Sequence, residues 1–138
     1  MEKIWDLSGE SPNQGKNPAI ILSHYAKRLK EDTNGVFRGL ITDAVDEENS
    51  SVTYALYVVV PELKNYMYRL IELKIENWVN LYPVELKLLA KEPKNNRITV
   101  ADNPEECELK LEEMIKSPIT KMSLQHLKTL IEIVKDTE

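Results

Sequence analysis

Val36–Val60 holds two strand-like runs on either side of a polar segment, and the rest of the predicted fold is arranged around it. The runs are VFRGLITDAV (Val36–Val45) and VTYALYVVV (Val52–Val60), and the segment between them is DEENSS (Asp46–Ser51). Both runs are rich in β-branched and aromatic residues, which favour strands, whereas the acidic and serine-rich segment is typical of a turn. The pattern predicts a β-hairpin.

Three further strands are predicted after this hairpin. Pro61 ends the second strand, because proline cannot donate a hydrogen bond to a sheet ladder. A third strand is predicted over Tyr66–Glu76, although residues 63–71 also fit a helix, and a fifth over Arg97–Ala101. The fourth, Val84–Lys91, alternates apolar and charged residues as a half-buried strand does.

Helix signals precede the hairpin. Asn17 can cap a helix, and Pro18 suits the first helical position because its missing N–H has no partner there. Apolar residues then recur with helical spacing and mark one buried stripe: Ile21, Leu22, Tyr25, Ala26 and Leu29. Asn34-Gly35 ends this helix, since glycine adopts the left-handed conformation at low cost.

The last third of the chain is also predicted to be helical. Asp102 or Asn103 caps a helix that opens at Pro104, and Ser117-Pro118 separates it from a second one. The buried stripe of the first helix is Cys107, Leu111, Met114 and Ile115, and that of the second is Leu124, Leu127, Leu130, Ile131 and Val134.

This order of elements predicts an α+β fold. We expect an N-terminal helix, an antiparallel meander of about five strands, and two C-terminal helices packed on one sheet face. Residues 1–17 are rich in turn formers without a period and are predicted to be an N-terminal arm, followed by a single α+β domain over 18–138.

Composition narrows the class of function. With 23 acidic and 18 basic residues the formal charge is −5, which disfavours nucleic acid and anionic membranes as partners. The single cysteine, Cys107, has no metal-binding spacing and falls on an apolar helix stripe, so we expect a buried thiol and no cofactor. Because one cysteine cannot form an internal disulfide and no apolar leader or membrane-length run is seen, we expect a cytoplasmic location. His24 and His126 are interpreted as ordinary helix-face residues.

A repeated Glu-x-Lys pattern predicts how the third and fourth strands pair. The two copies are Glu72-Leu73-Lys74 and Glu85-Leu86-Lys87. If these strands pair across a seven-residue connection, 77–83, then Glu72 lies opposite Lys87 and Lys74 opposite Glu85. Such a ladder of opposite charges is typical of a solvent-facing sheet.

Tyrosines make the same sheet face a candidate binding surface. Strand alternation places Tyr66 and Tyr68 beside Glu72 and Lys74, and Tyr57 of the second strand adds to them. Aromatic rings next to mixed charge are enriched at protein interfaces. The arm carries Trp5 in an apolar cluster, which either packs back onto the domain or docks on a partner.

The sequence therefore favours a non-catalytic protein-interaction module: an inhibitor, immunity-type protein, adaptor or regulatory subunit. The alternative is a divergent metal-dependent nuclease of the PD-(D/E)xK kind, in which Asp43 or Glu62 joins Glu72 as metal ligand and Lys74 positions water. A third hypothesis is a homodimer that pairs two open sheets.

Overall fold

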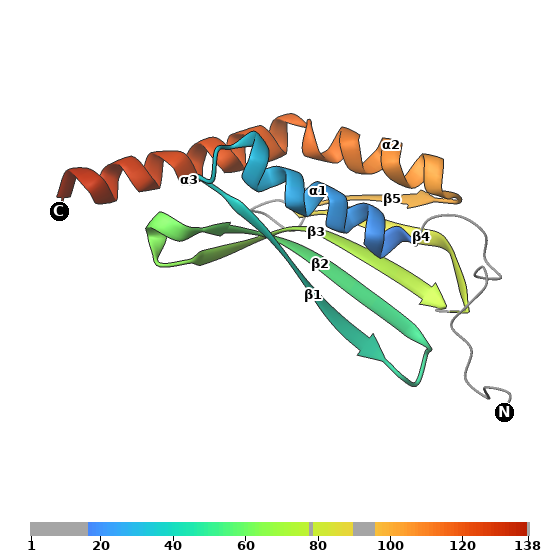
Figure 1. Cartoon of the computed structure of the whole chain (residues 1–138). Helices are drawn as coiled ribbons and strands as arrows, with labels where there is room; N and C mark the ends of the chain where they lie inside the picture. The colour runs from blue at the N-terminus through green and yellow to red at the C-terminus, as the bar shows by residue number, and fades with distance from the viewer. Residues whose placement is uncertain (1–16, 78, 90–95, 138) are drawn as a thin grey trace, which may run out of the picture.

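The computed structural model, which describes residues 17–77, 79–89 and 96–137, has three α-helices on one side of a five-stranded sheet (Figure 1). The elements are α1 (Pro18–Asp32), β1 (Arg38–Asp46), β2 (Ser51–Val60), the 3-10 helix η1 (Pro61–Leu63), β3 (Tyr66–Asn77), β4 (Asn80–Leu88), β5 (Arg97–Ala101), α2 (Pro104–Ile115) and α3 (Pro118–Thr137). The strands pair antiparallel in the order β1-β2-β3-β4-β5. The predicted α+β class is confirmed.

Side-chain caps begin the helices where the sequence predicts them. The Asn17 side chain accepts a hydrogen bond from the N–H of Ala19 at 2.8 Å, which satisfies a donor that the helix itself leaves free. Asn103, rather than Asp102, caps α2 by accepting from the N–H of Glu106 at 2.8 Å. The Glu106 carboxylate reaches past the cap and accepts from the N–H of Asp102 at 2.7 Å, which ties the residue before the cap to the first turn of α2.

The turn between β3 and β4 is shorter than the sequence predicts. Because β4 begins at Asn80, which pairs with Asn77, the predicted seven-residue connection is wrong. The Asn77 side chain accepts a hydrogen bond from the N–H of Val79 at 2.9 Å, so a side chain closes this turn without glycine. The fourth strand is predicted to end at Lys91, which lies outside the described residues.

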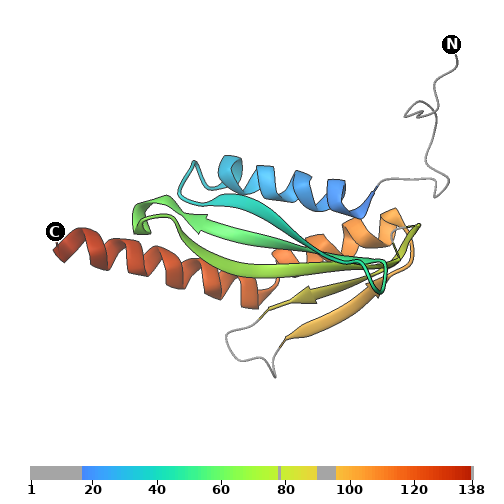
Figure 2. The ribbon, with the colours of Figure 1, turned by 90° about the horizontal axis from the view of Figure 1, so that it is seen from below.

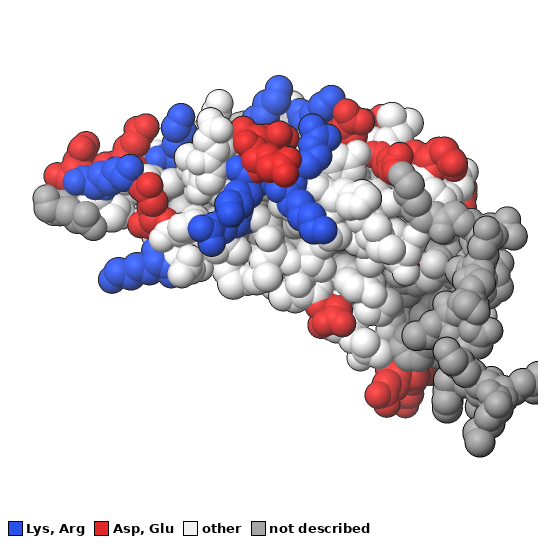
Figure 3. All heavy atoms as spheres, in the orientation of Figure 1, with Lys and Arg blue, Asp and Glu red and all other residues white. Residues whose placement is uncertain are grey.

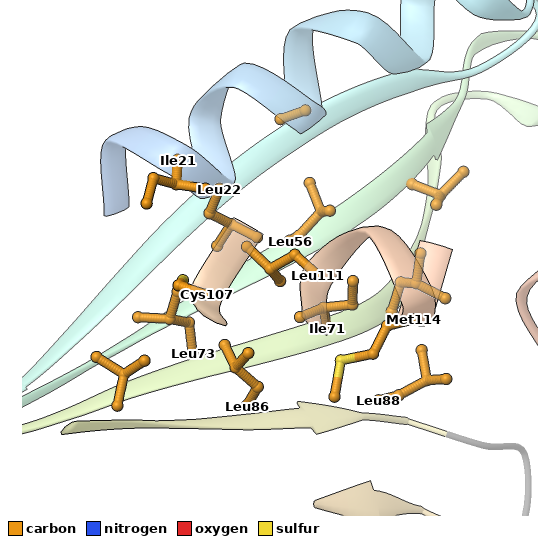
Figure 4. Packing of buried hydrophobic residues seen from close by; sticks show 14 of the residues in the cluster. Ile21, Leu22, Leu56, Ile71, Leu73, Leu86, Leu88, Cys107, Leu111 and Met114 are labelled. Carbon is orange, nitrogen blue, oxygen red and sulfur yellow. The ribbon is translucent and has the colours of Figure 1, made fainter. Parts of the chain in front are cut away.

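The main core lies between the helices and one face of the sheet. Figure 4 shows side chains from α1 and α2 pointing toward those of β2, β3 and β4. Its fully buried members include Leu22, Ile71, Leu73, Leu86 and Leu111, each 0% exposed. Close packing of this kind is the dominant stabilising contribution in a domain of this size. The opposite face of the sheet, here called the outer face, points away from the three helices (Figure 2).

Helix α3 is longer than the sheet face that it covers. Leu127 and Ile131 are buried as predicted, but Val134 is 37% exposed, which contradicts its predicted burial. The last turns of α3, to which Val134 belongs, extend past the ends of the strands (Figure 1). Neither α3 nor any other helix within the described ranges is long and apolar enough to cross a membrane.

Gly39 allows α1 to approach β1 closely. A Cβ atom built on Gly39 would lie 2.4 Å from the carbonyl oxygen and 2.7 Å from the Cα of Ala26. Both are backbone atoms, so a larger side chain could be accepted only if α1 moved away from the sheet. Glycine at this position therefore sets the height of α1 above the strands.

We expect Gly39→Ala to lower the free energy of unfolding by about 1–3 kcal/mol, because the added methyl group meets backbone that cannot rotate away. Urea unfolding followed by circular dichroism measures this loss. Gly35→Asn is the comparison: nothing lies within 4 Å of an added Cβ, so only the backbone strain of a φ of +82° acts, and because asparagine tolerates this region better than other side chains, the loss should be smaller than that of Gly39→Ala. Equal stability of Gly39→Ala and the parent chain would contradict the close approach.

Candidate binding groove

A bulge in β3 determines which side chains of this strand reach the helices. Leu56 of β2 pairs with Ile71, but its neighbour Tyr57 pairs with Arg69, so Leu70 is an extra residue in β3. Leu70 and Ile71 are consequently both buried, at 4% and 0% exposure, although neighbours in a regular strand point to opposite faces. The alternation of β3 therefore reverses at this point.

The reversal divides the predicted tyrosine surface between two faces of the sheet. Tyr66 and Tyr68 lie on the helix side, where the Tyr68 hydroxyl is 3.2 Å from the Ser123 hydroxyl of α3. Glu72 and Lys74, which follow the bulge, lie on the outer face. The prediction that all four share one face is wrong, because it assumed regular alternation through Leu70-Ile71.

Instead, the two tyrosines line a groove between β3 and α3, here called the Tyr66 groove. Its cavity volume is about 460 Å³. Two of its side chains are largely open to solvent, since Tyr66 is 50% and Met122 68% exposed. The lining residues are Tyr66, Tyr68, Ile119, Met122, Ser123, His126, Leu127 and Leu130.

The two hydroxyl groups that line the Tyr66 groove, those of Tyr68 and Ser123, are both hydrogen-bonded within the protein. The Ser123 hydroxyl donates to the carbonyl oxygen of Ile119 at 2.9 Å. Because that bond uses the serine proton, the Tyr68 hydroxyl is the donor in its 3.2 Å contact with Ser123. A ligand in the groove would therefore make mainly apolar contacts.

The wall of the groove on α3 is an apolar stripe that extends past the sheet. Its residues follow one another at intervals of three or four, which keeps them on one side of a helix. At a rise of about 1.5 Å per residue the stripe is about 20 Å long. Its last member, Ile133, is 53% exposed and lies beyond the groove lining. The stripe consists of the apolar residues Ile119, Met122, Leu130 and Ile133, with His126 on the same side of the helix between them.

An ion pair ties the end of α3 to the turn between β2 and β3. The Lys135 ammonium lies 2.9 Å from the Glu62 carboxylate of η1. The chain then turns through Lys64 and Asn65, whose φ angles of 57° and 60° are left-handed. Both side chains of the ion pair are about half exposed, so its contribution to stability is below about 1 kcal/mol. The pair joins the last turn of α3 to η1, at the end of the sheet where β3 begins.

On the outer face, the predicted charge ladder is confirmed in register. Glu72 lies opposite Lys87 and Lys74 opposite Glu85. The predicted binding residue Trp5 lies outside the described residues, so its relation to this face stays a prediction.

Ion pairs on this face run along β3. Glu72 lies 3.4 Å from Arg69, and Lys74 lies 3.7 Å from Glu76. The Arg69 guanidinium also sits over the ring of Tyr57, 5.7 Å from its centroid. Tyr57, Glu72 and Lys74 therefore do share one face, as predicted, and the tyrosines of the groove do not belong to it.

The carboxylates of the nuclease alternative do not converge. Asp43 lies on the helix side of β1, and Glu72 lies on the outer face beside Arg69. Glu62 is paired with Lys135 at one end of the sheet. Among residues 17–77, 79–89 and 96–137, no group of three or more His, Cys, Asp or Glu side chains is placed to hold a metal ion. The geometry gives this alternative no support.

Cys107 is a buried thiol in the core, as predicted. Its side chain is 0% exposed and packs among the apolar residues of α2 and the sheet. Burial raises the pKa of this thiol from its ordinary value of 9.0 to about 12, and the carboxylate of Glu108 acts in the same direction. The reactive thiolate is therefore suppressed at neutral pH.

Comparison with protein-family models, curated proteins and solved structures found no match to this chain. The candidate site consequently rests on the geometry of the Tyr66 groove.

The hydrogen bond of Tyr68 should be measurable. We expect Tyr68→Phe to lower the free energy of unfolding by about 0.5–1.5 kcal/mol, because the donor to Ser123 is lost while the ring stays packed. Tyr66→Phe serves as the control, since its ring is half exposed, and should change stability by less than about 0.5 kcal/mol. Urea unfolding of both variants distinguishes them, and equal effects would contradict the bond.

Cys107 should resist alkylation in the native chain. We expect no reaction with Ellman's reagent at pH 8, and full reaction once urea unfolds the protein. Because the folded pKa is raised, the unfolded thiol ionises first, and stability falls as pH rises above 9.0 toward about 12. Cys107→Val should reduce that alkaline loss of stability. Rapid labelling of the folded chain would show that the thiol is accessible.

Proposed function

We propose that this chain is a non-catalytic protein-interaction module, of the inhibitor, immunity-type, adaptor or regulatory-subunit kind. In this proposal the Tyr66 groove holds an amphipathic helix of a partner protein. The observation that supports it best is the apolar stripe of α3, which leaves Met122 and Ile133 in solvent at 68% and 53% exposure. Soluble proteins seldom leave aligned apolar side chains uncovered without a binding role.

The length of the stripe favours a protein segment over a small ligand. The groove volume of about 460 Å³ falls within the range of small-molecule sites. However, the apolar surface continues along α3 to Ile133, which is outside that cavity. A surface about 20 Å long and one helix face wide matches the apolar side of another helix of about four turns.

The residue types in the groove also suit protein binding. Tyr66 offers a rigid ring that buries a large area with little loss of side-chain freedom. Met122 has a flexible and polarisable side chain that adapts its shape to the partner. Tyr68 joins the two walls of the groove through its bond to Ser123 of α3. A polar or charged side chain at Met122 would then face the apolar side of the partner helix.

We expect Met122→Glu to weaken partner binding by about tenfold or more, because a carboxylate would be buried without a counter-charge. The measurement is capture of the partner from the native source by tagged chain, followed by titration of the purified pair. The matched control is Leu109→Glu, which places the same charge on an exposed apolar residue of α2 (57% exposed) outside the groove.

A third variant separates the groove from the outer face. Tyr57→Ala removes the aromatic ring of the outer face and leaves the groove intact. Binding that survives Met122→Glu but is lost in Tyr57→Ala would move the site to the outer face. If all three variants bind like the parent chain, neither surface is the binding site.

A further inference from the structure

The two edges of the sheet are unequal. In the strand order β1-β2-β3-β4-β5, both β1 and β5 present backbone N–H and C=O groups to the outside. β5 has only five residues, and Lys110 of α2 donates a hydrogen bond to the carbonyl oxygen of Val100. β1 has nine residues, none of which is buried. The long and accessible edge therefore belongs to β1.

Within the described part of the chain, the backbone of β1 makes hydrogen bonds only in its ladder with β2. Helix α1 contacts β1 from above, where Ala26 lies over Gly39, and does not close the edge. Figures 1 and 3 share one orientation, in which the flank along β1 is mostly uncharged and acidic groups gather toward the end of the β1–β2 hairpin. Between Arg38 and Asp46 at its ends, β1 carries one charged residue, Asp43, and it has neither a proline nor a bulge, so few of the usual devices protect this edge from pairing with another strand.

The sequence of β1 is complementary to itself. When a second β1 runs antiparallel to the first about a two-fold axis at Thr42, Arg38 of each copy lies opposite Asp46 of the other. Opposed residues of antiparallel strands point to the same face, so each arginine meets an aspartate on the outer face. Both ends of the pairing then carry opposite charges.

The same register matches side-chain size along the strand. Leu40, which is 43% exposed, lies opposite Ala44, and Val45, which is 54% exposed, lies opposite Gly39. A large side chain thus meets a small one at both positions. With the axis at Ile41 instead, Arg38 would lie opposite Ala44 of the other copy. With the axis at Asp43, Arg38 would have no partner, because β1 of the other copy ends at Asp46. The axis at Thr42 is the one that uses all nine residues.

We propose that β1 is a dimerisation edge whose partner is a second copy of this chain, joined in this register into one sheet with five strands from each copy. The pairing satisfies the outward backbone groups of β1 and covers Leu40 and Val45. It leaves the Tyr66 groove free, because that groove is formed by β3 and α3.

Cysteine cross-linking of the full chain tests the register. Thr42→Cys places two thiols opposite each other across the axis, so mild oxidation should convert most of the protein into a disulfide-linked dimer. Ala44→Cys is the matched control, because its two copies would lie four residues, or about 13 Å, apart along the strands. The native Cys107 is buried and does not compete. No dimer with Thr42→Cys, or equal cross-linking of both variants, overturns the proposal.

Charge exchange gives an independent test. Arg38→Asp opposes aspartate to Asp46 at both ends, and should raise the dimer dissociation constant in sedimentation equilibrium by about tenfold. Adding Asp46→Arg to the same chain should restore association. Asp46 also accepts hydrogen bonds from Asn49 in its turn, so circular dichroism must show that the double variant is folded. A folded double variant that remains as weak as the single one overturns the pairing.

Discussion

In the central strand β3, the side chains before and after Leu70 could not all be buried if the strand were regular. The strand has neighbours on both edges, β2 and β4, and the helices cover one of its faces. One extra residue brings Tyr68 and Leu70 to the same side as Ile71 and Leu73. The continuous apolar face of the sheet, the position of α3 and the polar outer face all depend on this bulge.

The Tyr66 groove lies where the packing between helices and sheet is least complete. Near α1 and α2, apolar side chains from both layers interlock and exclude water (Figure 4). Between the start of β3 and the first turns of α3, Tyr66 and Met122 stay partly in solvent and border a cavity. The ion pair of Lys135 with Glu62 holds the helix end near the turn between β2 and β3. Stable packing at one end of the molecule thus leaves an apolar surface at the other.

Local sequence signals predicted most of the fold, but predicting the site required knowing how β3 packs against α3, which are far apart in the sequence. The caps at Asn17 and Asn103 and the charge register of Glu72 with Lys87 follow from neighbouring residues, and the structure has them. The placement of Tyr66 and Tyr68 required the bulge, whose only trace in the sequence is the apolar pair Leu70-Ile71. Met122 and His126 were not predicted to belong to a site, because their partners come from a strand more than fifty residues away.

The unequal edges of the sheet have a consequence for solubility. Sheets that can add strands at both sides grow without limit, and such growth leads to fibrils. Here one edge is the five-residue strand β5, where Lys110 donates a hydrogen bond to the carbonyl oxygen of Val100, and the other edge would be covered by the two-fold pairing proposed for β1. Assembly of this kind is closed: it ends at two chains and leaves no long margin on which a third could be added.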